Sequence, residues 1–256
     1  MLTQDRHRFL LRRLEETGSL KMAGLDKELD VNAMTVWRDL RLLEQRGLLK
    51  RVHGGAVRAD RSVEPEFRLK QQRALAEKRL IAATAVRNHV RPGDVVILEG
   101  GTTVAELLGH LPPRDLTLMT NSLPILTRAH ALGRGWQIHG SGGTLSPVSG
   151  NFVGPEAVEF FQKNFATTFF MSATGLDPAS GFLTDPNPVE IEVKRAMAKA
   201  ARKIVLLLDS SKIGVRSVQS VLPLAEIDVL VCDAKLDPKA VRPLRAAGLK
   251  IEYARR

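Results

Sequence analysis

Short, uninterrupted runs of apolar residues alternate with amphipathic segments from residue 92 to the end of the chain. An apolar run of about four to eight residues is typical of a strand that is buried on both faces, as in a parallel sheet covered by helices on both sides. The pattern therefore predicts an α/β domain with an open, mostly parallel sheet. Strands are expected at residues 95–98, 116–119, 136–139, 167–171, 204–208, 229–232 and 249–253, and helices at 102–111, 122–132, 155–163, 189–201 and 238–247.

The first 58 residues have a different pattern, in which three helical segments precede a hairpin. Helices are expected at 3–17, 22–30 and 32–46, the last one capped by Asn32 and ended by Gly47. The short turn before Asn32 predicts a helix-turn-helix, whose second helix enters the major groove of DNA. Strands at 48–52 and 56–58 on either side of a glycine pair predict a wing. The N-terminal domain is therefore expected to be a winged helix.

The third helix has one apolar face, formed by Val36, Leu40 and Leu43, and an opposite polar stripe. From this stripe, Arg38 is expected to read a guanine, worth about 1–3 kcal/mol of discrimination, or else to contact phosphate or an internal carboxylate. Asp39 would repel phosphate, so we expect it to pair with an arginine of its own domain. The residues expected at the DNA, some of which also have structural uses as caps, packing or turn residues, are Asn32, Met34, Thr35, Trp37, Arg38, Arg41, Arg51, His53 and Gly54.

The charge of the chain favours an anionic partner. Lys and Arg number 38 against 28 Asp and Glu, a formal net charge of +10, and residues 31–58 hold six basic and two acidic side chains. No apolar run is long enough for a membrane helix, and the N-terminus lacks a signal-peptide core. One cysteine, Cys232, excludes an internal disulfide and is expected in the core. We expect a soluble, cytoplasmic protein without metal, cofactor or membrane partner.

A polar segment containing Pro65 separates the two halves, and a helical pattern follows it to about residue 90. The predicted organisation is a DNA-binding domain at 1–58, a linker at 59–75 and an α/β domain at 76–256.

The segment VNAMTVWRDLRLLEQRGLLKRVHGGA, residues 31–56, resembles the signature of DeoR-type bacterial transcriptional regulators. The chain departs from the family pattern at Trp37, where an arginine is usual, and at Lys21, where a helix-capping Ser or Thr is common. The resemblance implies a winged helix that binds operator DNA. Because operators are built from half-sites, we expect a dimer or tetramer. The matching positions are Thr35, Arg38, Asp39, Leu40, Gly47, His53, Gly54, Gly55 and Ala56.

Small and polar residues follow several predicted strands of the second half. Open parallel sheets bind ligands at the carboxyl ends of their strands, and free N–H groups at a helix start attract anions. The loops LEGGTT (98–103), TNS (120–122), HGSGGT (139–144) and DSSK (209–212) together predict a phosphate site. A P-loop, a complete dinucleotide fingerprint and a hydrolase elbow are all absent from the sequence.

These loops occur in the order of the DeoR family, whose C-terminal domain resembles ribose-5-phosphate isomerase and binds a phosphorylated sugar. By that resemblance Gly101, Thr102 and Thr103 hold the phosphate, and Lys212 supplies positive charge. Lys194 and Arg195, in the helix at 189–201, are interpreted as a solvated face. The remaining residues implied near the sugar are Glu99, Asn121, Ser122, Gly142 and Gly143.

The function predicted from these features is a repressor of carbohydrate genes that a sugar phosphate releases from DNA. A sugar-phosphate isomerase with an accessory DNA module is the alternative, and it needs a carboxylate base such as Asp177, Asp185 or Glu190. A nonspecific architectural DNA binder is a third possibility, which leaves the phosphate loops without a use.

Overall fold

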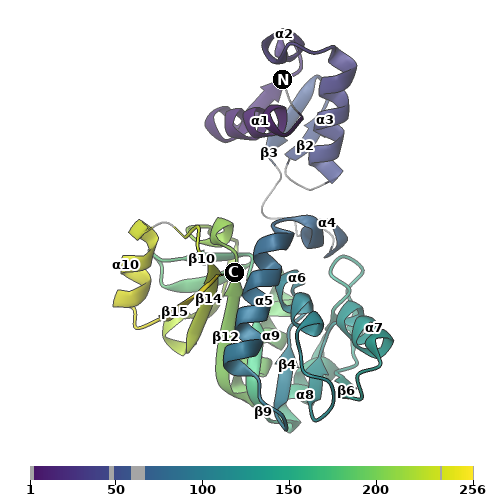
Figure 1. Ribbon diagram of the computed structural model, residues 1–256, viewed down its shortest axis with the longest axis vertical. Coiled ribbons are helices and arrows are strands. Elements are labelled where there is room, and N and C mark those ends of the chain that lie inside the picture. Colours follow the sequence, from purple (N-terminus) through teal and green to yellow (C-terminus); the bar gives the residue numbers. More distant parts are fainter. Residues whose placement is uncertain (1–2, 46–48, 59–66, 237, 256) are drawn as a thin grey trace. The chain divides into compact units, whose positions relative to one another are not determined.

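The computed structural model describes residues 3–45, 49–58, 67–236 and 238–255. The chain folds into two compact units, Met1–Arg73 and Ala74–Arg256 (Figure 1). Residues 59–66 of the predicted linker, as well as the predicted helix end at Arg46 and Gly47, lie outside the described residues. In the part of the chain that is described, no helix is both long and apolar enough to cross a membrane.

The first unit is the expected winged helix. Its elements are α1 (Thr3–Thr17), β1 (Ser19–Lys21), α2 (Leu25–Leu29), α3 (Ala33–Gln45), β2 (Leu49–Val52), β3 (Gly55–Arg58) and α4 (Phe67–Gln72). The strands form an antiparallel sheet in the order β1-β3-β2. One apolar cluster joins the helices to the sheet, formed by Leu10, Leu14, Leu20, Leu25, Leu29, Val36, Leu40, Leu43, Leu49 and Ala56.

Two local predictions for this unit were wrong. The strand β1 was not expected, because only one apolar side chain, Leu20, marks this three-residue segment. It pairs closely with β3, where a Cβ at Gly55 would lie 1.8 Å from the carbonyl oxygen of Leu20. The second helix, expected at 22–30, has only five residues, because Gly24 and Asp30 adopt left-handed conformations on either side of it.

The second unit contains the predicted parallel sheet, with seven strands in the order β15-β14-β12-β9-β4-β5-β6. All six pairings in this sheet are parallel. The strands are β4 (Val95–Leu98), β5 (Thr117–Thr120), β6 (Gln137–Gly140), β9 (Ala166–Met171), β12 (Ala201–Leu208), β14 (Val229–Asp233) and β15 (Lys250–Ala254). The predicted α/β fold is confirmed.

Helices cover both faces of the sheet (Figure 1). The helix α5 (Leu75–His89) lies on one face, and α8 (Pro155–Lys163) and α9 (Pro188–Ala200) lie on the other. Successive side chains of a strand point to opposite faces, so the adjacent Phe169 and Phe170 are both fully buried. This explains why the strands appear as continuous apolar runs. The other helices are α6 (Thr102–Ala105), α7 (Leu123–Leu132) and α10 (Pro238–Ala246).

Some elements of this unit were not predicted. The helix expected at 102–111 consists of the four-residue α6 and a 3-10 turn, η1 (Glu106–Gly109). Two small antiparallel sheets are added, one with the order β10-β11-β13 and one formed by β7 and β8. Strands this short have too few residues to show the apolar pattern from which a strand is predicted. Their bounds are β7 (Thr144–Leu145), β8 (Phe152–Val153), β10 (Gly175–Asp177), β11 (Phe182–Asp185) and β13 (Gln219–Pro223), and two further 3-10 turns are η2 (Ser210–Lys212) and η3 (Leu224–Glu226).

Candidate functional site

The polar stripe of α3 is exposed on the helix-turn-helix unit. Met34 is 71% exposed, and Arg38 and Arg41 are exposed on the same side of the helix. Asn32 caps the helix as predicted, because its side-chain oxygen accepts hydrogen bonds from the backbone N–H of Thr35 at 2.7 Å and from the Thr35 hydroxyl at 2.9 Å. The hydroxyl of Thr35 is therefore engaged within the helix start.

Asp39 is the internal partner that the sequence predicted, and its contacts lie in α1. Arg6 donates from Nε to Asp39 Oδ2 at 2.7 Å and from a terminal nitrogen to Oδ1 at 3.3 Å. The Nε2 atom of His7 lies 2.9 Å from the same Oδ1. Burial raises the pKa of Asp39, but the hydrogen bonds from Arg6 and His7 outweigh burial, so that this pKa lies below its usual value. These contacts of Asp39 with Arg6 and His7 hold the recognition helix α3 against α1.

Arg51 on the wing is engaged within the domain, which weakens its predicted role at phosphate. Its Nε donates to Glu44 Oε2 at 2.6 Å, and its backbone N–H donates to Glu44 Oε1 at 2.8 Å. The guanidinium also lies 5.9 Å from the centre of the Trp37 ring, which supports the packing interpretation of that half-buried side chain. His53 and Gly54 form the exposed turn of the wing, and Gly54 has a φ of 80°.

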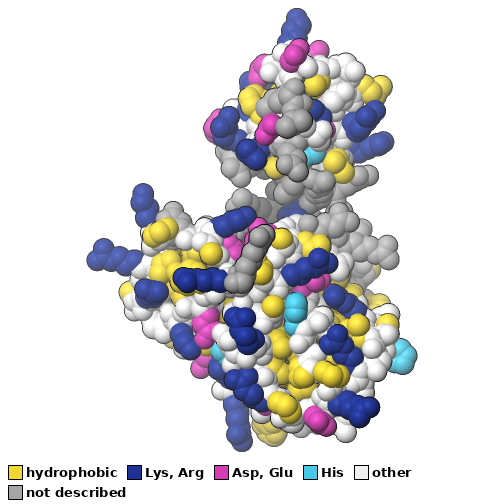
Figure 2. Space-filling view, in the orientation of Figure 1, with side chains coloured by type: hydrophobic (Ala, Val, Ile, Leu, Met, Phe, Trp, Pro, Cys, Tyr) yellow, Lys and Arg dark blue, Asp and Glu magenta, His cyan; other side chains and the backbone are white. Residues whose placement is uncertain are grey.

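Basic side chains do not by themselves locate the DNA surface. Lys and Arg are distributed over the visible face of the α/β unit as well as over the helix-turn-helix unit (Figure 2). The exposed stripe of α3 is therefore a better guide than the net charge of +10.

In the α/β unit, the strand order reverses between β4 and β9. The chain builds outward from β4 through β5 to β6, then crosses to β9 and continues outward through β12, β14 and β15. Ligands of open parallel sheets bind at such a reversal, outside the carboxyl ends of the two strands. The residues that follow β4 and β9, Glu99 and Ser172, meet there, since Glu99 Oε2 accepts hydrogen bonds from the backbone N–H and the hydroxyl of Ser172 at 3.1 and 3.0 Å.

The two glycines of the loop after β4 lie against side chains of neighbouring loops. A Cβ at Gly100 would lie 1.8 Å from Asn151 Oδ1, and a Cβ at Gly101 would lie 2.0 Å from the hydroxyl oxygen of Ser172. The following Thr102 accepts a hydrogen bond from Lys78 Nζ at 3.0 Å. Lys78 lies on α5 and is only 3% exposed, so α5 brings a buried positive charge to this loop.

Three buried oxygen atoms beside the strand reversal have no hydrogen-bond partner within the described residues. They are Thr103 Oγ1, Asn121 Oδ1 and Asn151 Oδ1. Their side chains are otherwise held in place, because Asn121 Nδ2 donates to the carbonyl of Phe152 at 3.1 Å and Asn151 Nδ2 donates to Glu190 Oε2 at 3.4 Å. Buried polar atoms are nearly always paired, so a ligand with hydroxyl groups would satisfy these.

Lys194 is not part of a solvated face, and that interpretation was wrong. It is 6% exposed, and its Nζ lies 3.2 Å from Glu99 Oε1 and also forms an ion pair with Asp185. Burial lowers the pKa of Lys194, but the two carboxylates outweigh burial and raise it above its usual value. Arg195 is exposed, yet it donates to the carbonyls of Val221 and Ser220, both at 2.9 Å.

The remaining predicted ligand residues differ in whether they reach the strand reversal between β4 and β9. Lys212 reaches the strand reversal, since its Nζ donates to the carbonyl of Ala173 at 2.8 Å. Ser122 is the N-cap of α7. Gly142 and Gly143 form an exposed turn after the edge strand β6, with φ values of 67° and 108°, and no described contact joins them to the loop after β4.

Lys78 and Asn151 were not predicted from the sequence. A signal for Lys78 was present, because positions 78, 81, 82 and 85 share one helix face and the other three carry Ile81, Ala82 and Ala85. A lysine on such an apolar face marks a buried charge. Asn151 lies in a loop without a motif, so no comparable signal exists for it.

Each of the carboxylates that the isomerase alternative would use has hydrogen-bond or ion-pair partners within the α/β unit. Asp185 pairs with Lys194 and accepts from the backbone N–H of Thr174 at 2.7 Å, and burial, which raises its pKa, is outweighed by Lys194, so that the pKa is lowered. Asp177 accepts from the backbone N–H of Ala179 at 3.0 Å. Glu190 accepts hydrogen bonds from Asn151 and Asn187.

Comparison with known proteins agrees with this architecture. The family model of the DeoR C terminal sensor domain matches residues 73–234, and that of the DeoR-like helix-turn-helix domain matches residues 6–62. The HTH-type transcriptional regulator GlpR of Haloferax volcanii is 34% identical over 98% of each chain. The HTH-type transcriptional repressor CsqR of Escherichia coli K12 is 31% identical over 93% of this chain and 90% of that protein.

Among solved structures, ribose 5-phosphate isomerase A of Methanocaldococcus jannaschii aligns with 53% of each chain at 18% identity and a TM-score of 0.39. The sequence matches are far more extensive, and they span both units. The chain belongs to the DeoR family and is a DNA-binding transcriptional regulator with an N-terminal helix-turn-helix domain and a C-terminal sensor domain.

Proposed function

We propose that this regulator is a repressor and that a sugar phosphate, bound at the reversal between β4 and β9, releases it from operator DNA. The observation that carries the proposal is the group of three buried, unpartnered oxygens of Thr103, Asn121 and Asn151. They lie beside two glycines against which the side chains of Asn151 and Ser172 pack, and a buried lysine reaches the same loop. The relative CsqR, which spans nearly the whole chain, is named a repressor.

In this proposal the phosphate lies at Gly101, Thr102 and Thr103, and its charge is balanced by Lys78 and Lys212. The four-residue helix α6 is too short to supply the dipole of a long helix, so the lysines carry the electrostatic attraction. Asn121 and Asn151, on the neighbouring loops, hydrogen-bond the sugar hydroxyls. Because the site binds without chemistry in this proposal, no turnover of the sugar phosphate is expected.

Fluorescence anisotropy with DNA from the region upstream of the chain's own gene, at fixed salt, tests the proposal. We expect one compound from a panel of sugar phosphates to release the DNA, and scrambled DNA to bind at least about 10³-fold more weakly. Specific DNA binding that no sugar phosphate disturbs would contradict the ligand assignment. A sugar phosphate that tightens DNA binding would show that the ligand acts on DNA affinity in the direction opposite to the one proposed.

Lys78→Gln is expected to weaken sugar-phosphate affinity by roughly 10- to 100-fold, because a charge-assisted hydrogen bond contributes about 1.5–3 kcal/mol. DNA binding without ligand is expected to stay unchanged. Isothermal titration calorimetry gives the affinity, and Arg79→Gln is the matched control, since the neighbouring Arg79 side chain is 62% exposed. Equal affinities for the two variants would remove Lys78 from the phosphate site.

Arg38→Ala and Arg41→Ala are expected to change DNA binding in different ways. If Arg38 reads a guanine, its loss costs about 1–3 kcal/mol on the correct operator and relaxes specificity at one base pair. Loss of Arg41, as a phosphate contact, weakens binding to all sequences alike and reduces the slope of affinity against salt. Anisotropy on an operator and its single-base variants at several salt concentrations measures both. Uniform weakening by Arg38→Ala would assign it to phosphate instead.

A further inference from the structure

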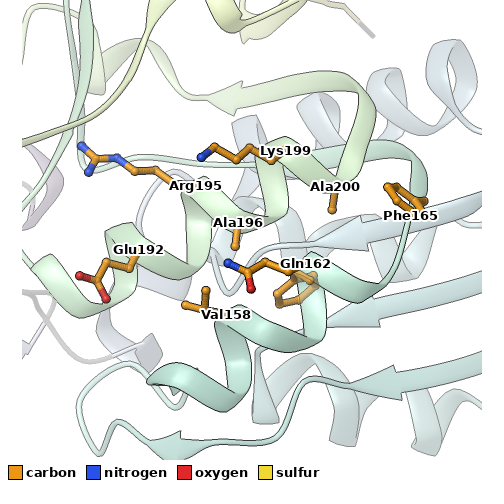
Figure 3. A pocket seen from close by; sticks show the side chains of 9 residues that line it. Val158, Gln162, Phe165, Glu192, Arg195, Ala196, Lys199 and Ala200 are labelled. Carbon is orange, nitrogen blue, oxygen red and sulfur yellow. The ribbon is translucent and has the colours of Figure 1, made fainter.

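Phe165 and Met34 are the two most exposed large apolar side chains in the described part of the chain, at 79% and 71%. Phe165 stands next to Ala200, at one end of a cavity of about 390 Å³ between α8 and α9 that apolar side chains partly line (Figure 3). Met34 belongs to the first turn of the recognition helix α3. A single exposed apolar side chain is common on protein surfaces, so the place of Met34 in the fold is more informative than its exposure.

The long side chains exposed beside Met34 are positively charged. Within residues 33–44 of α3, the exposed positions are Ala33, Met34, Arg38 and Arg41. Met34 and Arg38 are four residues apart, so their Cβ atoms lie about 5–6 Å from each other on one face of the helix. An apolar side chain thus lies directly beside a guanidinium on the face that is expected to enter the major groove.

The polar groups at the start of α3 are engaged with each other. The side-chain oxygen of Asn32 accepts hydrogen bonds from the backbone N–H and the hydroxyl of Thr35, at 2.7 and 2.9 Å. Recognition helices contact base edges with residues near their N-terminus, and long helical side chains point toward that end. Of the exposed side chains in the first two turns, those of Met34 and Arg38 are therefore long enough to reach the bases.

The chemistry of a methionine selects one feature of the major groove. Each base pair presents hydrogen-bond donors and acceptors there, and thymine alone among the four bases adds an apolar group, its C5-methyl. The thioether of methionine has no donor and is only a weak acceptor, so over a guanine or cytosine edge it would displace water without replacing the hydrogen bonds. Against a methyl group no hydrogen bond is lost, and the flexible, polarisable methionine adapts to the position of that group.

We propose that Met34 reads the C5-methyl group of a thymine in the operator. The contact buries the exposed methionine and the methyl group together, and burial of one such group contributes a factor of about four to the affinity. Met34 thereby sets the base preference at one position, beside the contact made by Arg38. This role depends on the DNA-binding activity of the family, and it is independent of the ligand and of the direction in which the ligand acts.

Replacing thymine by deoxyuridine tests the contact, because it removes the methyl group and leaves every hydrogen-bonding atom of the base in place. The operator is first selected from a random DNA library with the wild-type chain. Each of its thymines is then replaced in turn in synthetic DNA, where thymine is the only source of a C5-methyl group. We expect at least one replacement to weaken wild-type binding by about three- to tenfold, measured by fluorescence anisotropy at fixed salt. The same replacement is expected to leave the affinity of Met34→Ala unchanged, because the truncated side chain no longer reaches the methyl group.

Arg41→Ala is the matched control, because loss of a phosphate contact lowers the affinity for all sequences and keeps the sensitivity to that methyl group. Met34→Leu, which retains an apolar side chain of similar volume, is also expected to keep the sensitivity. The proposal is overturned if no replacement weakens the wild type by more than about twofold, or if every loss persists in Met34→Ala. A library from which no sequence is enriched would overturn it together with sequence-specific DNA binding itself, which distinguishes that outcome from the other two.

Discussion

Replacing Lys194 by methionine is expected to lower the free energy of unfolding of the α/β unit by about 3–5 kcal/mol. Lys194 Nζ pairs with both Glu99 and Asp185, and all three side chains are no more than 7% exposed. Without the ammonium group two carboxylates remain buried close together, and neither can be solvated. Loss of this lysine is also expected to weaken ligand binding, because Glu99 holds Ser172 at the strand reversal.

Chemical denaturation followed by Trp136 fluorescence measures this effect. The chain has two tryptophans, so a Trp37→Phe background leaves Trp136, which is buried in the α/β unit. Lys163→Met, at a 70% exposed side chain, is the control and is expected to change stability by less than about 0.5 kcal/mol. Adding Glu99→Gln and Asp185→Asn to Lys194→Met is expected to recover part of the loss. If the triple variant is no more stable than the single one, uncompensated charge is not the cause.

Asp39→Ala is expected to destabilise the helix-turn-helix unit by about 3–5 kcal/mol and to abolish DNA binding. The change takes the carboxylate away from Arg6, whose side chain is only 10% exposed. A unit of this size has only a few kcal/mol of stability, so the loss is comparable to the whole. Trp37 fluorescence in a Trp136→Phe background reports the unfolding. Asp5→Ala is the control, since Asp5 forms a surface pair with Arg8 at 3.7 Å and is 44% exposed.

The stability that the ionised Asp39 contributes to the helix-turn-helix unit depends on pH, because the pKa of Asp39 is lowered in the folded protein. In the unfolded chain an aspartate has a pKa of about 3.9. A carboxyl whose folded pKa is lower contributes stability that is present above that value and is lost as the pH falls through the folded pKa. The difference in Tm between wild type and Asp39→Ala is therefore expected to be largest at neutral pH and to decrease below about pH 4. A difference that stays constant down to pH 3 would contradict the role of the ionised pair.

The sequence predicted the faces of the elements better than the contacts between them. The periodicity of α3 placed Val36, Leu40 and Leu43 in the core and Arg38 on the outside, and the structure confirms both. The same reasoning predicted an internal partner for Asp39 but could not name Arg6, which is 33 residues away. Lys194 was assigned to the surface, although Ile191 and Ala198 on the same face, both buried, place it among apolar neighbours.

The local sequence pattern determined the winged helix and the parallel sheet. Helices and strands each have a characteristic spacing of apolar residues, and the residues that cap or end them lie within a few positions along the chain. The pattern also located the loops after β4 and β5, since their glycines and hydroxyls directly follow apolar strands. Only the tertiary structure brought Lys78 to Thr102, Asn151 to Gly100 and Lys194 to Glu99. These contacts depend on the order of the strands and on which helix covers which face, and no period along the chain records that order.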